Sequence, residues 1–467
     1  MGTILVVLII YFILMLGVGI WANRFNNDVD DFLLAGRRLG LVFASFALAA
    51  TYFGGGFVIG IGQMAYEKGL VAWWNGIAGG LGLILVALVA CKMRDMALYT
   101  VPDFLGKRFN SQFISSVASL LSLVALVGIL AGQVSAARNV FAALGMNPVI
   151  GGFVAAVIFV VYTSIGGLWA ATLTDFIQMI IAGIGCVAAA LIVINNTGGW
   201  EATTVMINQV NPPESFYSMM GGDGFSFILW LTLPLILYTF IGQDVYQRIF
   251  ASKDGRTARN SCIVAGVIII LVTVFPALMG MSARGMFPEL ADTGMAVPTL
   301  ILKALSPVMA GLVLAAIMAA IMSTAASILT AATSHVINDV YRQILHKGRE
   351  LDSKRLLVLS RIWTLIIGFL AIILSFLVPQ IVKLLLMSYT LYTSGVFIPV
   401  VGGFFWKKAT REGAVAALIT GTAIAVASIG GVSFFGIPTE IFSGLVCLVI
   451  FVGVSLATQQ NLPSAAN

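Results

Sequence analysis

The chain has 467 residues, of which 60% are hydrophobic and only 9% are charged, and its mean hydropathy is +1.04. Soluble globular domains are about 25% charged, so this composition excludes that class and predicts an outer surface that faces lipid. The basic residues behind the net charge of +6 are spread over several loops instead of one patch, which argues against nucleic acid as a partner.

Apolar segments of membrane-spanning length recur along the chain. A helix needs about 20 apolar residues to cross the hydrocarbon core, and clear runs of this kind, with their flanks, cover 4–22, 180–194, 262–281 and 441–456. About thirteen such helices are expected in all. The sequence therefore predicts an all-α polytopic membrane protein with one transmembrane domain over residues 1–467.

The basic residues also predict an orientation. Most Lys and Arg residues fall in alternate loops at 24–38, 92–108, 248–259, 342–361 and 407–411. The positive-inside rule makes these loops cytoplasmic. Thirteen helices then place the N-terminus outside and the C-terminus in the cytoplasm, and the compact loops favour the inner (plasma) membrane of a bacterium.

The first core span, 41–66, contains three successive glycines in its middle, at 54–56. Glycine costs about 1 kcal/mol relative to alanine inside a helix, and non-helical backbone is tolerated at membrane depth only inside protein or beside a water-filled cavity. Unwinding here would free carbonyl oxygens for a cation, and Tyr52 and Phe57 would line a solute pocket. Close packing of two helices is the alternative reading.

A second interruption is expected around Pro234 and Gly242. Either a proline kink or a full break fits this pattern. It lies five helices after the glycine stretch, which suits two inverted five-helix repeats with broken first and sixth core helices. We expect the repeats at 41–222 and 223–408. A leading helix and cytoplasmic loop (1–40) precede them, and two trailing helices with a short tail (409–467) follow.

Three hydroxyl side chains, Ser323, Thr324 and Ser327, fall largely on one side of an apolar helix. Hard cations prefer oxygen ligands, so these hydroxyls and the unwound carbonyls would suit sodium. The alternative is that the hydroxyls bond back to their own helix.

Two charged residues in apolar surroundings have open roles. Asp175 is either a carboxylate stabilised at a helix N-terminus or a cation ligand or gate, because ionisable groups within membranes are usually functional. Arg138 either extends to the membrane interface or holds a carboxylate-bearing substrate.

The segments 162–178, 244–254 and 319–327 (YTSIGGLWAATLTDFIQ, DVYQRIFASKD and AAIMSTAAS) together resemble the sodium:solute symporter family. The resemblance extends over nearly the whole chain. It implies a fold of two inverted repeats, sodium coupling by alternating access, and no organic cofactor or enzymatic activity. It also implies that solute, sodium and the lipid bilayer are the partners of a protein that functions as a monomer.

The resemblance also implies a sodium site and, in some members, a second cation site near the cytoplasm. In this chain Ala326 stands where one hydroxyl of the second site is expected. The resemblance therefore does not imply that a second sodium binds. The sodium ligands are Ala50, Phe53, Ala320, Ser323 and Thr324, and the second set is Asp175 and Ser327. The expected substrate site is lined by Tyr52, Gly54, Gly55, Gly56, Phe57, Gln63, Gln133, Arg138, Tyr238 and Gln243.

The sequence thus favours a sodium-coupled symporter that imports a small polar organic solute. Arg138 favours a carboxylate, such as a pantothenate-like compound or an amino acid, whereas the 51–56 stretch is similar to the choline branch, where aromatic side chains cage a cation. A sugar substrate and proton coupling through Asp175 stay open. A channel or solute sensor is less favoured, because the chain shows no filter motif.

Overall fold

The computed structural model describes residues 2–222, 224–346, 351–378 and 381–459, and the predicted tail 460–467 lies outside them. Within these residues the chain forms helices and no strand, apart from one isolated bridge between Leu39 and Ser252. The prediction of an all-α protein is confirmed.

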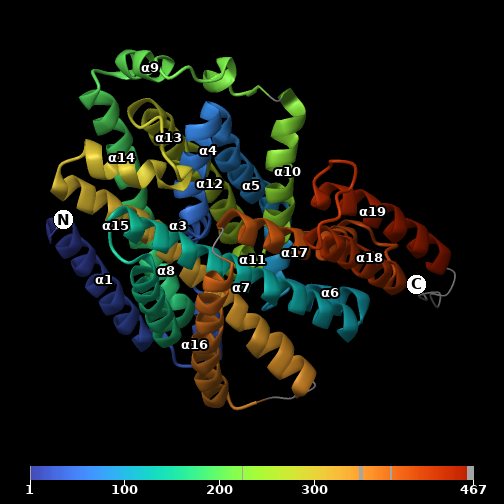
Figure 1. Ribbon diagram of the computed structural model, residues 1–467. Helices are drawn as coiled ribbons and strands as arrows, with labels where there is room; N and C mark the ends of the chain where they lie inside the picture. The colour runs from blue at the N-terminus through green and yellow to red at the C-terminus, as the bar shows by residue number, and fades with distance from the viewer. Residues whose placement is uncertain (1, 223, 347–350, 379–380, 460–467) are drawn as a thin grey trace.

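The helices surround a buried centre (Figure 1). In chain order they are α1 (Gly2–Ala22), α2 (Val29–Leu34), α3 (Leu41–Tyr52), α4 (Ile61–Lys68), α5 (Trp74–Asp95), α6 (Val101–Phe109), α7 (Gln112–Ala143), α8 (Pro148–Asn196), α9 (Trp200–Asn208), α10 (Gly224–Ile241), α11 (Gln243–Ala251), α12 (Gly255–Val272), α13 (Val274–Met286), α14 (Ala296–Ala304), α15 (Pro307–Ser334), α16 (Ser353–Leu377), α17 (Ile381–Phe405), α18 (Arg411–Ile429) and α19 (Thr439–Thr458).

Helix α15 forms the centre of the bundle. From Val313 to Ser334 every residue of this helix is buried, and it packs against α1, α3, α7, α8 and α16. Peripheral helices instead expose large apolar side chains, such as Leu88 on α5 and Val449 on α19. An apolar exterior around a fully buried helix is the arrangement that a lipid environment requires.

Ten helical stretches among the described residues are long and apolar enough to cross a membrane. Some of them run through breaks, so the expected number of about thirteen spans stays a prediction. In α8 the break lies at Gly167 (φ 55°, ψ −144°). A Cβ atom there would lie 2.5 Å from the carbonyl oxygen of Phe32, so only glycine fits.

The predicted glycine break is present. Helix α3 ends at Tyr52, and the chain becomes helical again in a π-helical segment, Gly56–Gly60, that leads into α4. A Cβ atom at Gly54 would collide with Thr324 Oγ1. Both readings of the glycines, unwinding and close helix packing, are therefore correct here, because the unwound backbone lies directly against α15.

The second break is complete and lies at Gly242, not at the proline. Helix α10 continues through Pro234 and ends at Ile241. Gly242 then takes an extended conformation (φ −61°, ψ 121°), and α11 begins at Gln243. Both core helices expected to be broken are therefore interrupted by one to three non-helical residues.

The predicted basic loops meet at one end of the bundle, which we call the basic end. Arg37 donates to the carbonyls of Ala97 and Leu98 at 2.9 and 3.1 Å. Arg108 donates to the carbonyls of Gly403 and Trp406 at 2.8 and 3.1 Å. These contacts join three stretches that are far apart in the sequence, around residue 37, residues 97–108 and residues 403–406.

Candidate cation and solute site

Four oxygen atoms converge where the break after α3 meets α15. Ser323 Oγ lies 3.1 Å from the Ala50 carbonyl oxygen and 2.9 Å from that of Ala320. Thr324 Oγ1 lies 3.1 and 3.3 Å from the same two carbonyls. All four residues are buried. Two carbonyls and two hydroxyls at such distances form an oxygen cluster of the kind that a hard cation binds.

Phe53 completes this region from the α3 side. Its backbone is non-helical (φ −76°, ψ 60°), which turns its carbonyl out of the direction of the helical hydrogen bonds. The unwound residues end in a close approach to α15 at Gly54. The four converging oxygens thus belong to residues predicted from the sequence, and Phe53 lies next to them in the chain.

The predicted second cation residues lie beside this cluster: Ser327 is one helical turn further along α15, and Asp175 is on α8. Ser327 Oγ donates to Asp175 Oδ2 at 3.2 Å and accepts from Thr51 Oγ1 at 3.1 Å. Asp175 lies eight residues beyond the break at Gly167 and is fully buried. It is therefore not a residue that caps a helix N-terminus, and that reading of the sequence is wrong.

A basic side chain occupies this second cluster. Arg248 on α11 is fully buried, its Nη2 lies 3.4 Å from Asp175 Oδ2, and it also donates to Ser327 Oγ. Its Nη1 donates to the carbonyls of Asp244 and Ser327 at 3.2 and 3.4 Å. A guanidinium thus lies at the residues that were named as a possible second cation site.

The prediction that Arg248 belongs to a basic cytoplasmic loop is wrong. Every residue of α11 is buried, because the helix inserts between α3, α5 and α15. One signal was available: Arg248 follows Gly242 by only six residues and is flanked by Val245, Ile249 and Phe250, an apolar pattern unlike a loop.

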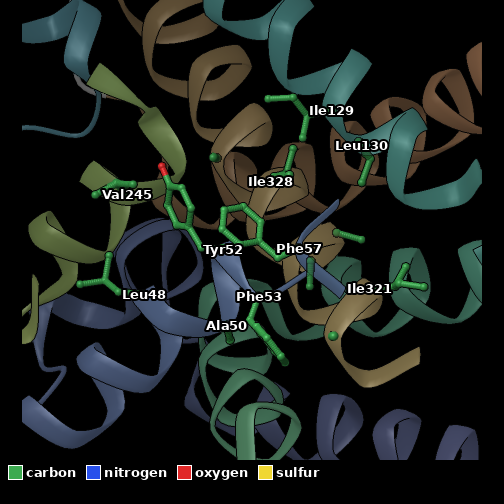
Figure 2. Packing of buried hydrophobic residues seen from close by; sticks show 14 of the residues in the cluster. Leu48, Ala50, Tyr52, Phe53, Phe57, Ile129, Leu130, Val245, Ile321 and Ile328 are labelled. Carbon is green, nitrogen blue, oxygen red and sulfur yellow. The ribbon is translucent and has the colours of Figure 1, made fainter. Parts of the chain in front are cut away.

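Aromatic side chains line the other side of the glycine break. The rings of Tyr52 and Phe57 meet edge to face at 5.9 Å, and Figure 2 shows them beside apolar side chains of α7 and α15. Tyr52 Oη donates to Thr239 Oγ1 at 2.9 Å, which connects the two broken helices. The neighbouring Tyr238 packs on Tyr389 of α17, with ring centroids 4.5 Å apart.

Gln133 also contacts the break. Its Oε1 accepts a hydrogen bond of 3.1 Å from the Gly55 amide, and a Cβ atom at Gly55 would lie 2.6 Å from Ala136 Cβ. Helix α7 therefore also approaches the unwound backbone closely. Tyr52, the three glycines, Phe57, Gln133 and Tyr238 are brought together around both breaks.

Three predicted substrate residues have other partners. Gln63 Nε2 donates to Thr293 Oγ1 at 3.1 Å, away from the break. Arg138 Nη1 donates to the Ser375 carbonyl at 3.0 Å, and its guanidinium lies 5.2 Å from the Phe376 ring centroid. Gln243 is fully buried and uses both ends of its amide on the 99–101 backbone at the basic end.

Sequence reasoning missed three residues that bridge the elements of the site. Thr51 joins α3 to Ser327, Thr239 joins α10 to Tyr52, and Tyr392 on α17 donates to the Ile241 carbonyl at 3.1 Å beside the second break. Each is a hydroxyl next to or opposite a predicted residue. Only the break positions could have indicated them, since isolated hydroxyls are common in membrane helices.

Comparisons with known proteins agree on one kind of protein. A model of the sodium:solute symporter family matches residues 32–421. The osmoregulated proline transporter OpuE of Bacillus subtilis (strain 168) is 31% identical over 441 residues, covering 90% of this chain and 87% of the relative. The sodium/pantothenate symporter of Escherichia coli (strain K12) is 27% identical, covering 95% of this chain and 94% of the relative.

A solved structure has a similar fold. The substrate-bound outward-open state of a Na⁺-coupled sialic acid symporter superposes with a TM-score of 0.82 at 20% identity, covering 99% of this chain and 98% of that chain. At this identity the likeness concerns the fold alone, and it extends over the full bundle.

Proposed function

The chain belongs to the sodium:solute symporter family, and on this premise we propose that it imports a small polar organic carboxylate together with sodium. Na⁺ is the coupling ion of this family, which needs no organic cofactor. The observation that carries the proposal is the convergence of the Ala50 and Ala320 carbonyls with the Ser323 and Thr324 hydroxyls at the glycine break.

Sodium would bind at this junction and hold the broken first core helix against α15. Ala50, Ala320, Ser323 and Thr324 supply the four converging oxygens, and we assign the Phe53 carbonyl as a fifth ligand. The ion would replace hydroxyl-to-carbonyl hydrogen bonds with direct oxygen coordination. Binding would thus stabilise one position of α3 relative to α15, as alternating access requires.

The solute would bind beside the same break. Four elements place side chains around it: Tyr52 at the end of α3, Phe57 in the segment after the break, Gln133 on α7 and Tyr238 on α10. The helical segment that follows the break begins at Gly56, and helix N-termini attract anionic groups. Two of the similar proteins are named for proline and pantothenate, and both compounds carry a carboxylate, which supports this solute class.

Proton coupling is the second candidate, because Asp175 is a buried carboxylate close to the proposed sodium ligands. The contact between Asp175 and Arg248 favours the sodium reading, since the guanidinium already balances that carboxylate. We propose that Arg248 takes the place of a second cation and that one sodium binds per cycle.

We further propose how the protein lies in the membrane. The basic end faces the cytoplasm, the N-terminus lies outside, and a monomer is the working unit in a bacterial inner membrane. The repeats are 41–222 and 223–408, with the breaks at 53–55 and Gly242 in corresponding positions. The joining of the basic loops at one end supports this orientation.

Thermal unfolding of the purified protein tests the proposal. Proline, pantothenate, glucose and choline are added separately in sodium chloride and in potassium chloride. A ligand that binds only the folded state adds about 2.7 kcal/mol of stability at 100 times its Kd. We expect a carboxylate to raise Tm more in sodium than in potassium.

Two outcomes would contradict it. Stabilisation by glucose or choline, with none by either carboxylate, would overturn the solute class. A solute that stabilises the protein equally in both salts would overturn sodium coupling. Repeating the series across pH, with the unaltered protein and with Asp175→Asn, would then test whether a proton is the coupling ion.

The sodium ligands are tested with Ser323→Ala and Thr324→Ala. Hydrogen bonds to charged groups contribute about 1.5–3 kcal/mol, so removing both hydroxyls should raise the sodium concentration needed for solute-dependent stabilisation at least about tenfold. Ser334→Ala is the matched control, because among the described residues Ser334 Oγ bonds only to the carbonyl of Ala331 in its own helix. An unchanged sodium dependence in the double variant would exclude this site.

A further inference from the structure

An apolar groove opens on the outer surface between α1, α3 and α8, three helices that lie together in Figure 1. Its volume is about 750 Å³. It is lined by Ile13, Leu14, Gly17 and Trp21 of α1, Phe43 of α3 and Phe176 of α8, among others. The Phe43 and Phe176 rings meet at 5.1 Å. In a membrane protein such a groove contacts hydrocarbon.

Gly17 keeps this groove open. A Cβ atom at this position would meet no other atom within 4 Å, although Ile13 and Trp21 lie one turn away on the same helix face. The space beside Gly17 is thus bounded by large side chains and filled by none.

A basic side chain, Arg24, lies at one end of the groove. The guanidinium of Arg24 lies 3.6 Å from the ring centroid of Trp21, which lines the groove, and 4.8 Å from that of Phe25. Arg24 has neither an ion pair nor a hydrogen bond to other residues in the described part of the chain. Its neighbour Arg38 is different, because Asp31 binds it at 2.6 Å.

We propose that this groove binds one acyl chain of an anionic phospholipid, whose headgroup lies against Arg24. The argument is charge complementarity. The apolar walls would accept the acyl chain of any lipid, whereas an uncompensated guanidinium held on an aromatic ring favours an anionic headgroup over a zwitterionic one. The Trp21 and Trp169 rings would lie at the level of the headgroups, where such rings concentrate.

Native mass spectrometry of the purified full chain tests this site. Dioleoyl phosphatidylglycerol or dioleoyl phosphatidylcholine is titrated into the detergent solution, and the first bound lipid is quantified. One basic residue near a membrane surface contributes about 1 kcal/mol to the binding of anionic lipid, which is about fivefold in affinity. We expect phosphatidylglycerol to bind about fivefold tighter, and Arg24→Gln to abolish this preference.

Gly17→Leu and two control variants separate the site from general lipid contact. Gly17→Leu fills the groove and should remove the first binding event for both lipids. Gly453→Leu on α19 and Arg411→Gln on α18 should change nothing, since Gly453 also faces open space and Arg411 is an exposed residue of a helix that packs against α7, α17 and α19.

Three results would overturn the proposal. The first is equal affinity of the unaltered protein for the two lipids, and the second is a preference for phosphatidylglycerol that survives Arg24→Gln. The third is a mass spectrum in which a second copy of the chain binds in place of lipid and no longer binds in Gly17→Leu. If Gly17→Leu is not produced in folded form, the two arginine variants alone still decide the headgroup preference.

Discussion

Arg248 and Asp175 are a buried charge pair at the centre of the bundle. Their atoms approach to 3.4 Å, and neither side chain reaches solvent. Each charge therefore depends on the other, because an isolated ion away from water is far less stable than a paired one. Sequence alone could not find the pair, since 73 residues separate them and the burial of α11 follows from its packing.

Removing one member of the pair should lower the free energy of unfolding more than removing both members does. Asp175→Asn and Arg248→Gln each leave an uncompensated buried charge or lose its partners, which costs about 3–5 kcal/mol. The double variant should recover a large part of that loss. Chemical unfolding in potassium chloride, which avoids a contribution from bound sodium, measures the three values. If the double variant were as unstable as the sum of the single ones, the two charges would not interact.

At the scale of the elements, the two breaks position the site, and the sequence indicated them unequally. Three successive glycines in a long apolar span favour unwinding over a regular helix, so the first break was predicted at its true position. The second was left open between Pro234 and Gly242. A proline changes a membrane helix only if its neighbours do not accommodate the freed carbonyl, and the structure shows α10 continuous there.

The helix faces were harder to predict than the breaks. The sequence favours a solute role for Gln63 and Gln243 because they lie near the breaks, and for Arg138 because a cation can hold a carboxylate. Their side chains instead bond to Thr293, to the Ser375 carbonyl and to the 99–101 backbone. Which way a polar side chain points depends on the rotation of its helix within the bundle, and a sequence that is apolar on nearly all sides does not reveal that rotation.

The close approach of the first break to α15 predicts the effect of a single methyl group. In Gly54→Ala the added Cβ collides with Thr324 Oγ1, so α3 and α15 must separate at the sodium ligands. Overpacking of this kind costs about 1–3 kcal/mol, and stabilisation by sodium should be lost as well. Gly60→Ala is the control, since its Cβ would meet no atom within 4 Å.

Thermal unfolding with and without sodium measures both variants. If Gly54→Ala kept the sodium response of Gly60→Ala, the break and α15 would not form the site together.

At the scale of the whole molecule, composition alone predicted the class, because 9% charged residues cannot cover a soluble protein of 467 residues. The number of spans does not follow so directly. Helix α8 contains 49 residues and one break at Gly167, so hydropathy alone reads a single long apolar stretch there. A membrane protein of this kind is thus easier to classify from its sequence than to divide into helices.

The orientation of the molecule is testable at its two ends. The contacts of Arg37 and Arg108 gather the basic loops at one end, and basic residues are retained on the cytoplasmic side during insertion. Glu201 on α9 and Arg256 on α12 are both exposed. In a background with Cys91→Ser, where the remaining cysteines are buried, a membrane-impermeant maleimide should label Glu201→Cys in intact cells. It should label Arg256→Cys only after permeabilisation, and the reverse pattern would place the basic end outside and exclude the proposed orientation.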